Sequence, residues 1–140
     1  MITKTKPDSL GTLIKKLDTQ VSLFVRLEAT DYRGIVSCVS CGERMFWSDS
    51  DCCHCFDRGN MMTRYELMNL APGCQACNRF NPLIHKEKFK AQIKRRYGVQ
   101  AFEGLEQRSH AFQKWTRPEL ESMIEDFKGK VATIRKQKGL

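Results

Sequence analysis

Apolar residues recur at three- and four-residue steps over residues 9–29, which predicts an amphipathic helix. We interpret this apolar stripe first as a surface packed in the core of the same chain, and otherwise as a dimerisation surface. Similar patterns predict three more helices, over residues 86–97, 99–107 and 116–136. Gly98 is the stop signal between the first two of these. Thr116 and Glu119 form a capping box, with a proline between them, that opens the last.

Shorter patterns separate the first helix from the others. Residues 45–56 form a short aromatic run interrupted by the polar stretch 48–51, which predicts a β-hairpin with a polar turn. Residues 64–70 predict a short irregular or helical passage, and Pro72-Gly73 predicts a turn. The chain therefore reads as an α+β fold with helices at both ends. We expect an N-terminal helix over residues 1–34, a core over 35–98 and a basic helical region over 99–140.

Two CxxC pairs flank residues 42–73, Cys38 with Cys41 and Cys74 with Cys77. Each such turn brings two thiolates to one ion, and four sulfurs complete the tetrahedral shell of a structural zinc site. Disulfides or idle thiols are the alternative. However, seven cysteines are an odd number, and no apolar signal segment is present. Disulfides do not persist in a reducing cytosol, so we expect a cytoplasmic protein with Zn²⁺ on these four cysteines and no membrane segment.

The charge is unevenly distributed along the 140 residues. The net charge is +8, and residues 79–140 carry fifteen Lys and Arg against seven Asp and Glu. This half is the expected face for a polyanion. Its predicted helix 86–97 places basic residues partly on one face, as expected for contacts with DNA phosphates: Lys86, Lys90, Lys94, Arg95 and Arg96.

Three residues near the cysteine pairs offer the chemistry of phosphodiester hydrolysis. The imidazole of His54 suits a general base at neutral pH. The oxygens of Asp51 and Asn78 are hard ligands that suit Mg²⁺ or Mn²⁺. A second zinc site remains open, because three further cysteines adjoin His54; otherwise these are buried or free thiols: Cys52, Cys53 and Cys55. We expect His85 to be solvated more readily than to serve as an extra ligand.

The order and spacing of the motifs carry a family resemblance over most of the chain. The motifs are Cys38-x-x-Cys41-Gly42, Asp51-x-x-His54, Arg64-Tyr65-x-x-x-Asn69, Cys74-x-x-Cys77-Asn78, and Tyr97-Gly98 followed by Leu105-Glu106. This arrangement resembles the NinG (Rap) recombination endonucleases of lambdoid phages. That family is similar in design to HNH, or ββα-metal, nucleases and to the zinc-stapled phage endonuclease VII.

The resemblance implies a Mg²⁺-dependent nuclease of branched DNA, such as Holliday junctions and D-loops, in a phage-infected or lysogenic bacterial cell. It implies His54 as general base, Asn69 as a brace for the loop and Asn78 as a metal ligand. Many HNH enzymes place Asp directly before the base, where this chain has Cys53. Asp51 would point away from His54 in a regular strand and would need a bulge to share the site.

A junction nuclease also implies binding partners, and other functions remain open. Two matched nicks in a junction suggest a homodimer, with the N-terminal helix as its contact, and phage recombination proteins are further possible partners. Two other functions stay open: a zinc-stapled DNA-binding protein without catalysis, and an HNH nuclease that cuts ordinary duplex DNA.

Overall fold

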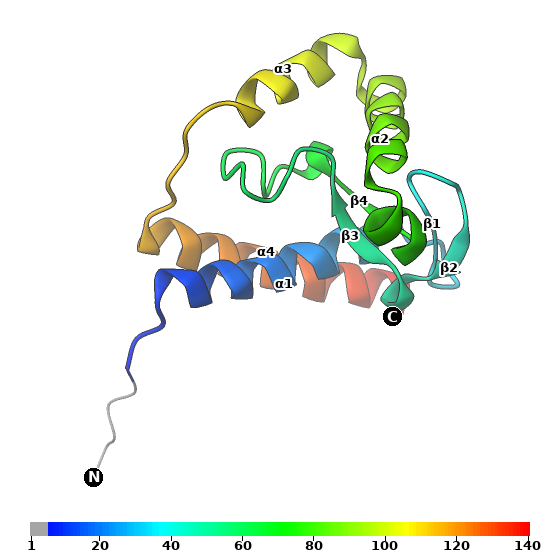
Figure 1. Ribbon diagram of the computed structural model, residues 1–140. Coiled ribbons are helices and arrows are strands. Elements are labelled where there is room, and N and C mark those ends of the chain that lie inside the picture. Colours follow the sequence, from blue (N-terminus) through cyan, green and yellow to red (C-terminus); the bar gives the residue numbers. More distant parts are fainter. Residues whose placement is uncertain (1–5) are drawn as a thin grey trace.

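Two long helices form one layer of the molecule. The computed structural model describes residues 6–140 (Figure 1), and in it α1 (Leu10–Glu28) and α4 (Arg117–Lys138) lie side by side and run in the same direction. Both helices begin at side-chain caps, since Ser9 accepts a hydrogen bond from the Thr12 backbone and Thr116 accepts one from the Glu119 backbone. The predictions of an N-terminal helix and of a capped C-terminal helix are confirmed.

The apolar stripe of α1 packs against α4. Phe24 meets Phe127 edge to face, with ring centroids 5.8 Å apart. At the end of α1, the Nζ atom of Lys138 donates to three carbonyl oxygens, those of Leu27, Glu28 and Thr30, at 2.6–2.9 Å. A cation at this end of a helix satisfies free carbonyls. The core-packing interpretation of the stripe is therefore confirmed, and the predicted homodimer is left without that contact surface.

Within residues 6–140, four short strands form two separate antiparallel pairs. β1 (Ile35–Ser37) pairs with β2 (Arg44–Phe46), and β3 (Asp51–His54) pairs with β4 (Leu70–Gly73). The predicted hairpin over residues 45–56 is wrong, because its two halves belong to different pairs. β2 finds its partner across the first CxxC loop, and a 3₁₀ turn (Trp47–Asp49) then redirects the chain into β3.

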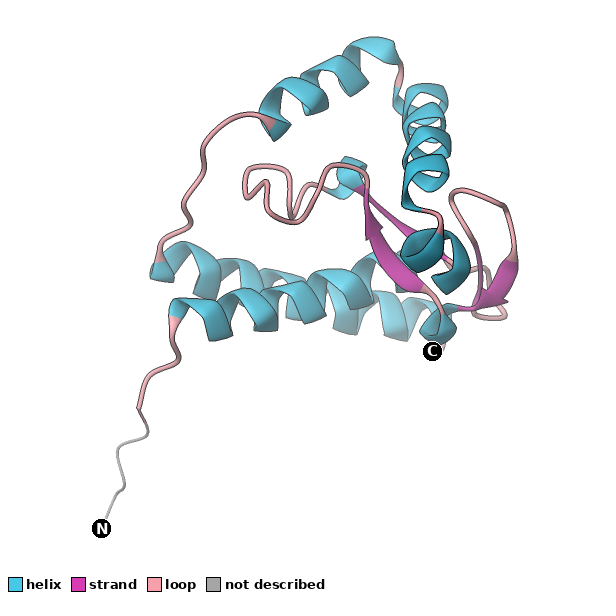
Figure 2. Cartoon of the chain, in the orientation of Figure 1, coloured by secondary structure: helices cyan, strands magenta, loops and turns pink. Residues whose placement is uncertain are grey.

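β3 lies between two apolar cores, and this burial explains its distant partner. Cys52 packs against the core between α1 and α4, whereas Cys53 and Cys55 are buried in a second core with residues of α2 and α3. Successive side chains of a strand point to opposite faces, so β3 is covered on both sides. Figure 2 shows β3 and β4 between the layer of α1 and α4 and the pair α2 and α3, with β1 and β2 to one side.

The sequence Pro72-Gly73 ends β4 and is not a turn. A Cβ atom at Gly73 would lie 2.5 Å from the Sγ atom of Cys53, so only glycine lets the two strands approach here. The backbone carbonyl of Pro72 accepts a hydrogen bond from Val39 at 3.0 Å, which ties β4 to the first CxxC loop. The turn prediction is wrong because it read these residues by their local preference alone.

A π-helical turn (Ala76–Phe80) follows the second CxxC, and then come α2 (Pro82–Tyr97) and α3 (Val99–Ser109). Gly98 separates these helices with φ of 93°, as its stop signal predicts. α2 begins four residues earlier than predicted, with Pro82 in its first turn. None of the helices in the described part of the chain is long and apolar enough to cross a membrane.

Candidate metal centre and arginine-lined cleft

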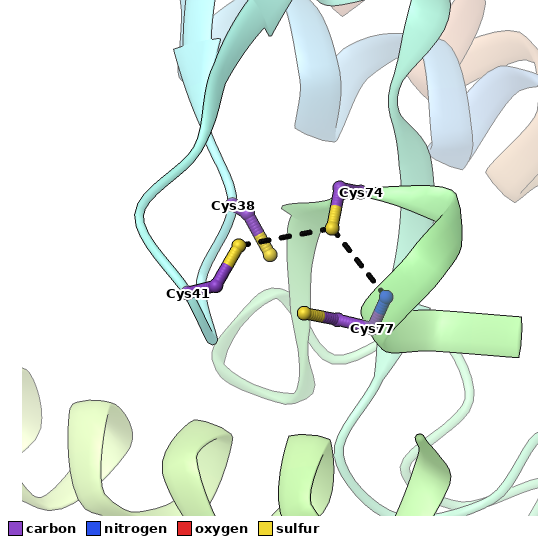
Figure 3. Close-up of side chains that lie close together, drawn as sticks. All are labelled: Cys38, Cys41, Cys74 and Cys77. Carbon is purple, nitrogen blue, oxygen red and sulfur yellow. Dashed lines mark hydrogen bonds between the residues drawn. The ribbon is translucent and has the colours of Figure 1, made fainter. Parts of the chain in front are cut away.

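The four cysteines of the CxxC pairs converge on one point (Figure 3). Cys38 and Cys41 come from the loop after β1, and Cys74 and Cys77 come from the end of β4 and the π-helical turn. Their sulfur atoms all lie within 4.8 Å of one another, and those of Cys41 and Cys74 are 3.8 Å apart. A tetrahedral Zn²⁺ with Zn–S bonds of about 2.3 Å needs sulfur atoms about 3.8 Å apart. The predicted cluster is confirmed, and its spacing fits Zn²⁺.

Backbone amides donate to sulfur atoms of the cluster, and of its cysteines Cys38 is the one whose pKa is lowered, whereas burial raises the pKa of Cys74. Ser40 donates its N–H to the sulfur of Cys38, and Cys77 donates to the sulfur of Cys74, both at 3.4 Å. Burial alone would raise the pKa of Cys38, but hydrogen bonds from backbone N–H groups outweigh it and lower this pKa to about 7. Deprotonated sulfur is the form that binds a metal.

The three other cysteines of this region are packed thiols. Burial raises the pKa of Cys52 to about 12 and of Cys55 to about 11, and it raises the pKa of Cys53 as well. Within residues 6–140, the four CxxC cysteines are the one group of three or more His, Cys and carboxylate side chains close enough to share an ion. The structure therefore gives no support to a second zinc site on these cysteines.

A cleft of about 490 Å³ opens between α1 and β3. His54, Asp51 and Asn78 all line it, so the structure brings together the three residues expected to carry chemistry. Sequence reasoning missed the basic side chains of its wall, which come from α1, the loop after β3 and the π-helical turn: Arg26, Arg58, Arg64 and Arg79. Two of them lie close in sequence to predicted site residues, since Arg58 follows His54 by four residues and Arg79 follows Asn78 directly.

The carboxylate of Asp51 is held by two neighbours. Asn78 donates its Nδ2 to Oδ2 of Asp51 at 2.9 Å, and Arg79 donates to both carboxylate oxygens at 2.9 and 3.0 Å. Burial opposes ionisation, but these donors outweigh it and lower the pKa of Asp51. Asp51 reaches the cleft without a bulge, since β3 pairs with β4 residue for residue. The expectation that a bulge is needed is wrong, because Asp51 is the first residue of the strand.

His54 is half-buried in the wall of the cleft. Burial lowers its pKa, and the guanidinium groups of Arg58 and Arg64 lower it further, to about 4. Asp18 of α1 fixes both arginines, with Arg64 at 2.6 Å and Arg58 at 2.8 Å. The imidazole is therefore neutral at pH 7 and can accept a proton.

His85 is buried, contrary to the expectation that it is solvated. Its side chain is 3% exposed, and neither ring nitrogen has a hydrogen-bond partner. The early start of α2 explains this, because it places His85 one turn before Phe89 on the inner face of the helix. A second opening of about 320 Å³ is lined by His85 together with His54 and Asn78. Phe89 follows His85 by four residues and therefore lies on the same face of the helix. This apolar neighbour is the sequence signal that would have identified His85 as buried.

Asn69 lies outside the cleft and holds the loop that follows β3. It is fully buried; its Oδ1 accepts from the backbone of Phe56 at 2.8 Å, and its Nδ2 donates to the carbonyls of Phe56 and Thr63 at 3.1 Å. This geometry agrees with the loop-bracing role that the resemblance implies.

Replacing Asn69 by alanine should lower the free energy of unfolding by about 3 kcal/mol, because buried backbone groups lose their partners. Denaturant unfolding measures this loss. Asn81→Ala is the matched control, since Asn81 is exposed and its side chain makes no capping hydrogen bond. Equal stability of the two variants would contradict the bracing role.

The basic residues predicted on α2 are mostly separate from the cleft. Lys86 lines the smaller opening and pairs with Asp57. Lys90 pairs with Glu87 at 3.7 Å, and the Nζ atom of Lys94 lies 4.7 Å from the ring centroid of Phe102. Arg95 and Arg96 are exposed near the end of the helix.

These features define an α+β protein with a four-cysteine cluster that fits a metal ion and with an arginine-lined cleft. Residues 2–137 match the family model described as bacteriophage lambda NinG protein. The match covers nearly the whole chain, so the protein belongs to the NinG family. Comparisons with curated proteins and with solved structures give no match.

Proposed function

We propose that this protein is a metal-dependent DNA endonuclease of the HNH, or ββα-metal, type that cuts branched recombination intermediates. One observation carries the proposal: β3, from the β3–β4 pair, and the π-helical turn before α2 place a neutral His54 and Asn78 together in a cleft walled by four arginines. Membership of the NinG family, together with the resemblance to recombination endonucleases, supports branched DNA as the substrate.

The arginines suit a DNA phosphate entering the cleft. Arg58 and Arg79 are exposed, so they can turn from their carboxylate partners to a phosphate. Arg64 is mostly buried in its ion pair with Asp18 and keeps the wall in place. A guanidinium binds phosphate oxygens through paired N–H donors, which fixes the position of the scissile group.

His54 then acts as the general base. It takes a proton from the water that attacks the phosphorus in line with the leaving 3′-oxygen. Its neutral state at pH 7 supports this role. Asn69 acts at a distance, since its hydrogen bonds to Phe56 and Thr63 fix the loop that continues from His54.

Side chains near His54 offer donor atoms of the kind that a divalent cation binds. Asn78 uses Nδ2 toward Asp51, which leaves its Oδ1 available as a ligand. Neither ring nitrogen of His85 has a partner, and the one that carries no proton can bind a cation. Asp51 joins them once Arg79 turns to the DNA phosphate. Bound Mg²⁺ or Mn²⁺ would stabilise the charge that develops on the leaving oxygen.

The test is cleavage of a labelled four-way junction by the purified protein in Mg²⁺, in Mn²⁺ and in EDTA. We expect cutting with either metal and binding alone in EDTA. Tight binding without cutting under both metals would reject catalysis and leave a zinc-stapled DNA-binding protein.

Neutralising Lys94, Arg95 and Arg96 with glutamine should reduce the slope of log K against log salt by about 3, roughly one unit for each lost phosphate contact. All three side chains are exposed, so the fold should persist. Filter binding at several salt concentrations measures the slope. A matched triple variant on α4, Lys128, Lys130 and Lys136 to glutamine, removes the same charge elsewhere. If the slope is unchanged in the α2 variant, this helix lies outside the interface.

A further inference from the structure

Three large apolar side chains are exposed together at the start of α2. Phe80 is 77% exposed, Leu83 81% and Ile84 61%. Nowhere else in residues 6–140 do three large exposed apolar residues fall within five positions. Apolar surface gathered in this way marks an interaction site more often than single exposed residues do.

The backbone itself keeps these side chains in solvent. The inner face of α2 is occupied by His85 and Phe89, so Leu83 and Ile84 fall on the outer face. Phe80 ends the π-helical turn just before the helix. The three residues, which we call the apolar wedge, alternate along the chain with residues that line the two openings around His54: Asn78, Arg79, Pro82, His85 and Lys86.

The positive charge around the apolar wedge favours a polyanion as its binding partner. From Arg79 to Arg96 the chain carries seven Lys and Arg (Arg79, Lys86, Lys88, Lys90, Lys94, Arg95 and Arg96) and a single acidic residue, Glu87. A second copy of this chain carries the same excess, within a net charge of +8, and would be repelled from this face. Nucleic acid satisfies both features, because it combines phosphates with apolar base faces.

We propose that the apolar wedge stacks against the unpaired or unstacked bases at a DNA branch point. The inference rests on the proposed function and names the feature of the substrate that is recognised. Intact linear duplex hides its base faces in the stack, whereas a branch point exposes them at little cost. Apolar side chains that insert at base steps are a known means of binding distorted DNA. The wedge adjoins the cleft, so a branch held there brings a neighbouring phosphate to His54.

The test uses a four-way junction with 2-aminopurine next to the branch, whose emission rises when the base unstacks. The protein is the full, zinc-loaded chain in buffer without added Mg²⁺ or Mn²⁺, so that the DNA is bound but not cut. The variants are the triple substitution Phe80→Ala, Leu83→Ala and Ile84→Ala, and the single substitution Phe80→Trp, which keeps a stacking ring. Phe112→Ala is the control, because Phe112 is 90% exposed and lies in the linker between α3 and α4.

The wild type, Phe80→Trp and Phe112→Ala should raise the emission, and the triple variant should not. The triple variant should also lose about tenfold or more of its binding preference for junction over linear duplex. The same rise and preference in the triple variant, or no rise with the wild type, would overturn the proposal. So would a wild-type dimer that becomes a monomer only in the triple variant, since a second copy would then be the occupant.

These outcomes distinguish failure of the apolar-wedge proposal from failure of the proposed nuclease function. If the wild type unstacks the branch but never cuts it with Mg²⁺ or Mn²⁺, the proposed function fails and the wedge stands. If the wild type cuts junctions and the triple variant unstacks them equally well, the wedge fails and the nuclease stands.

Discussion

Replacing His54 by alanine is expected to slow DNA cleavage by about 10²- to 10⁴-fold, the usual contribution of a general base. The side chain is half-buried in the cleft wall. β3 pairs with β4 through backbone groups, which the substitution leaves in place. Zinc content, thermal stability and junction binding should therefore remain close to those of the wild type. Single-turnover cleavage in saturating Mg²⁺ measures the effect.

His110→Ala is the matched control, because His110 is exposed in the linker before α4. It should cut at the wild-type rate. If His54→Ala releases zinc or unfolds, His54 is a structural residue and the base must be found elsewhere.

The pH profile of the wild type gives an independent readout of the same residue. The pKa of His54 is lowered to about 4, so the proton-accepting form persists as the pH falls well below 6.5. Values of kcat/KM should therefore hold from pH 7 to about pH 5 and fall as the pH approaches 4. Loss of activity through pH 6.5 would show that the histidine is exposed to solvent in the working enzyme.

The second large effect is expected on stability. Cys74→Ser should abolish binding of one Zn²⁺ per chain and lower the free energy of unfolding by about 4 kcal/mol or more, since loss of a structural metal is among the most damaging single changes. Cys74 is buried between the first CxxC loop and the π-helical turn, so both lose their common anchor. Native mass spectrometry gives the metal content, and denaturant unfolding gives the stability.

Cys55→Ala is the control that distinguishes loss of a metal ligand from loss of a buried thiol. Cys55 is equally buried, but it lies in the second core and outside the four-cysteine cluster. This variant should keep its zinc. Its free energy of unfolding should fall by less than that of Cys74→Ser, by the amount typical of removing a few atoms from a buried side chain. Retention of one Zn²⁺ by Cys74→Ser would contradict the four-cysteine site.

The sequence was sufficient to predict the elements whose ends are set by a few neighbouring residues. The caps at Ser9 and Thr116 and the stop at Gly98 depend on the identity of a few neighbouring residues, and all four helices that they bound were predicted from the sequence. The cysteine cluster was equally accessible, because a metal requires a defined spacing of ligands.

Features that depend on distant partners were not predicted. β3 pairs with β4, sixteen or more residues away in sequence, because each of its faces meets a different core, and no local pattern reports that. His85 was expected in solvent since its basic neighbours dominate the sequence, whereas the helix turns it inward beside Phe89. The cleft arginines come from three segments, so only the folded chain brings Arg26 near Arg79.

The most direct test of the central claim is a competition in one tube. A labelled four-way junction and a linear duplex of equal length, carrying a different label, are incubated with the wild-type protein in Mg²⁺ and sampled over time. The account predicts that the junction is nicked first and that EDTA stops the reaction. Equal cutting of both substrates would make the protein a nuclease of ordinary duplex DNA, and no cutting of either would contradict the account altogether.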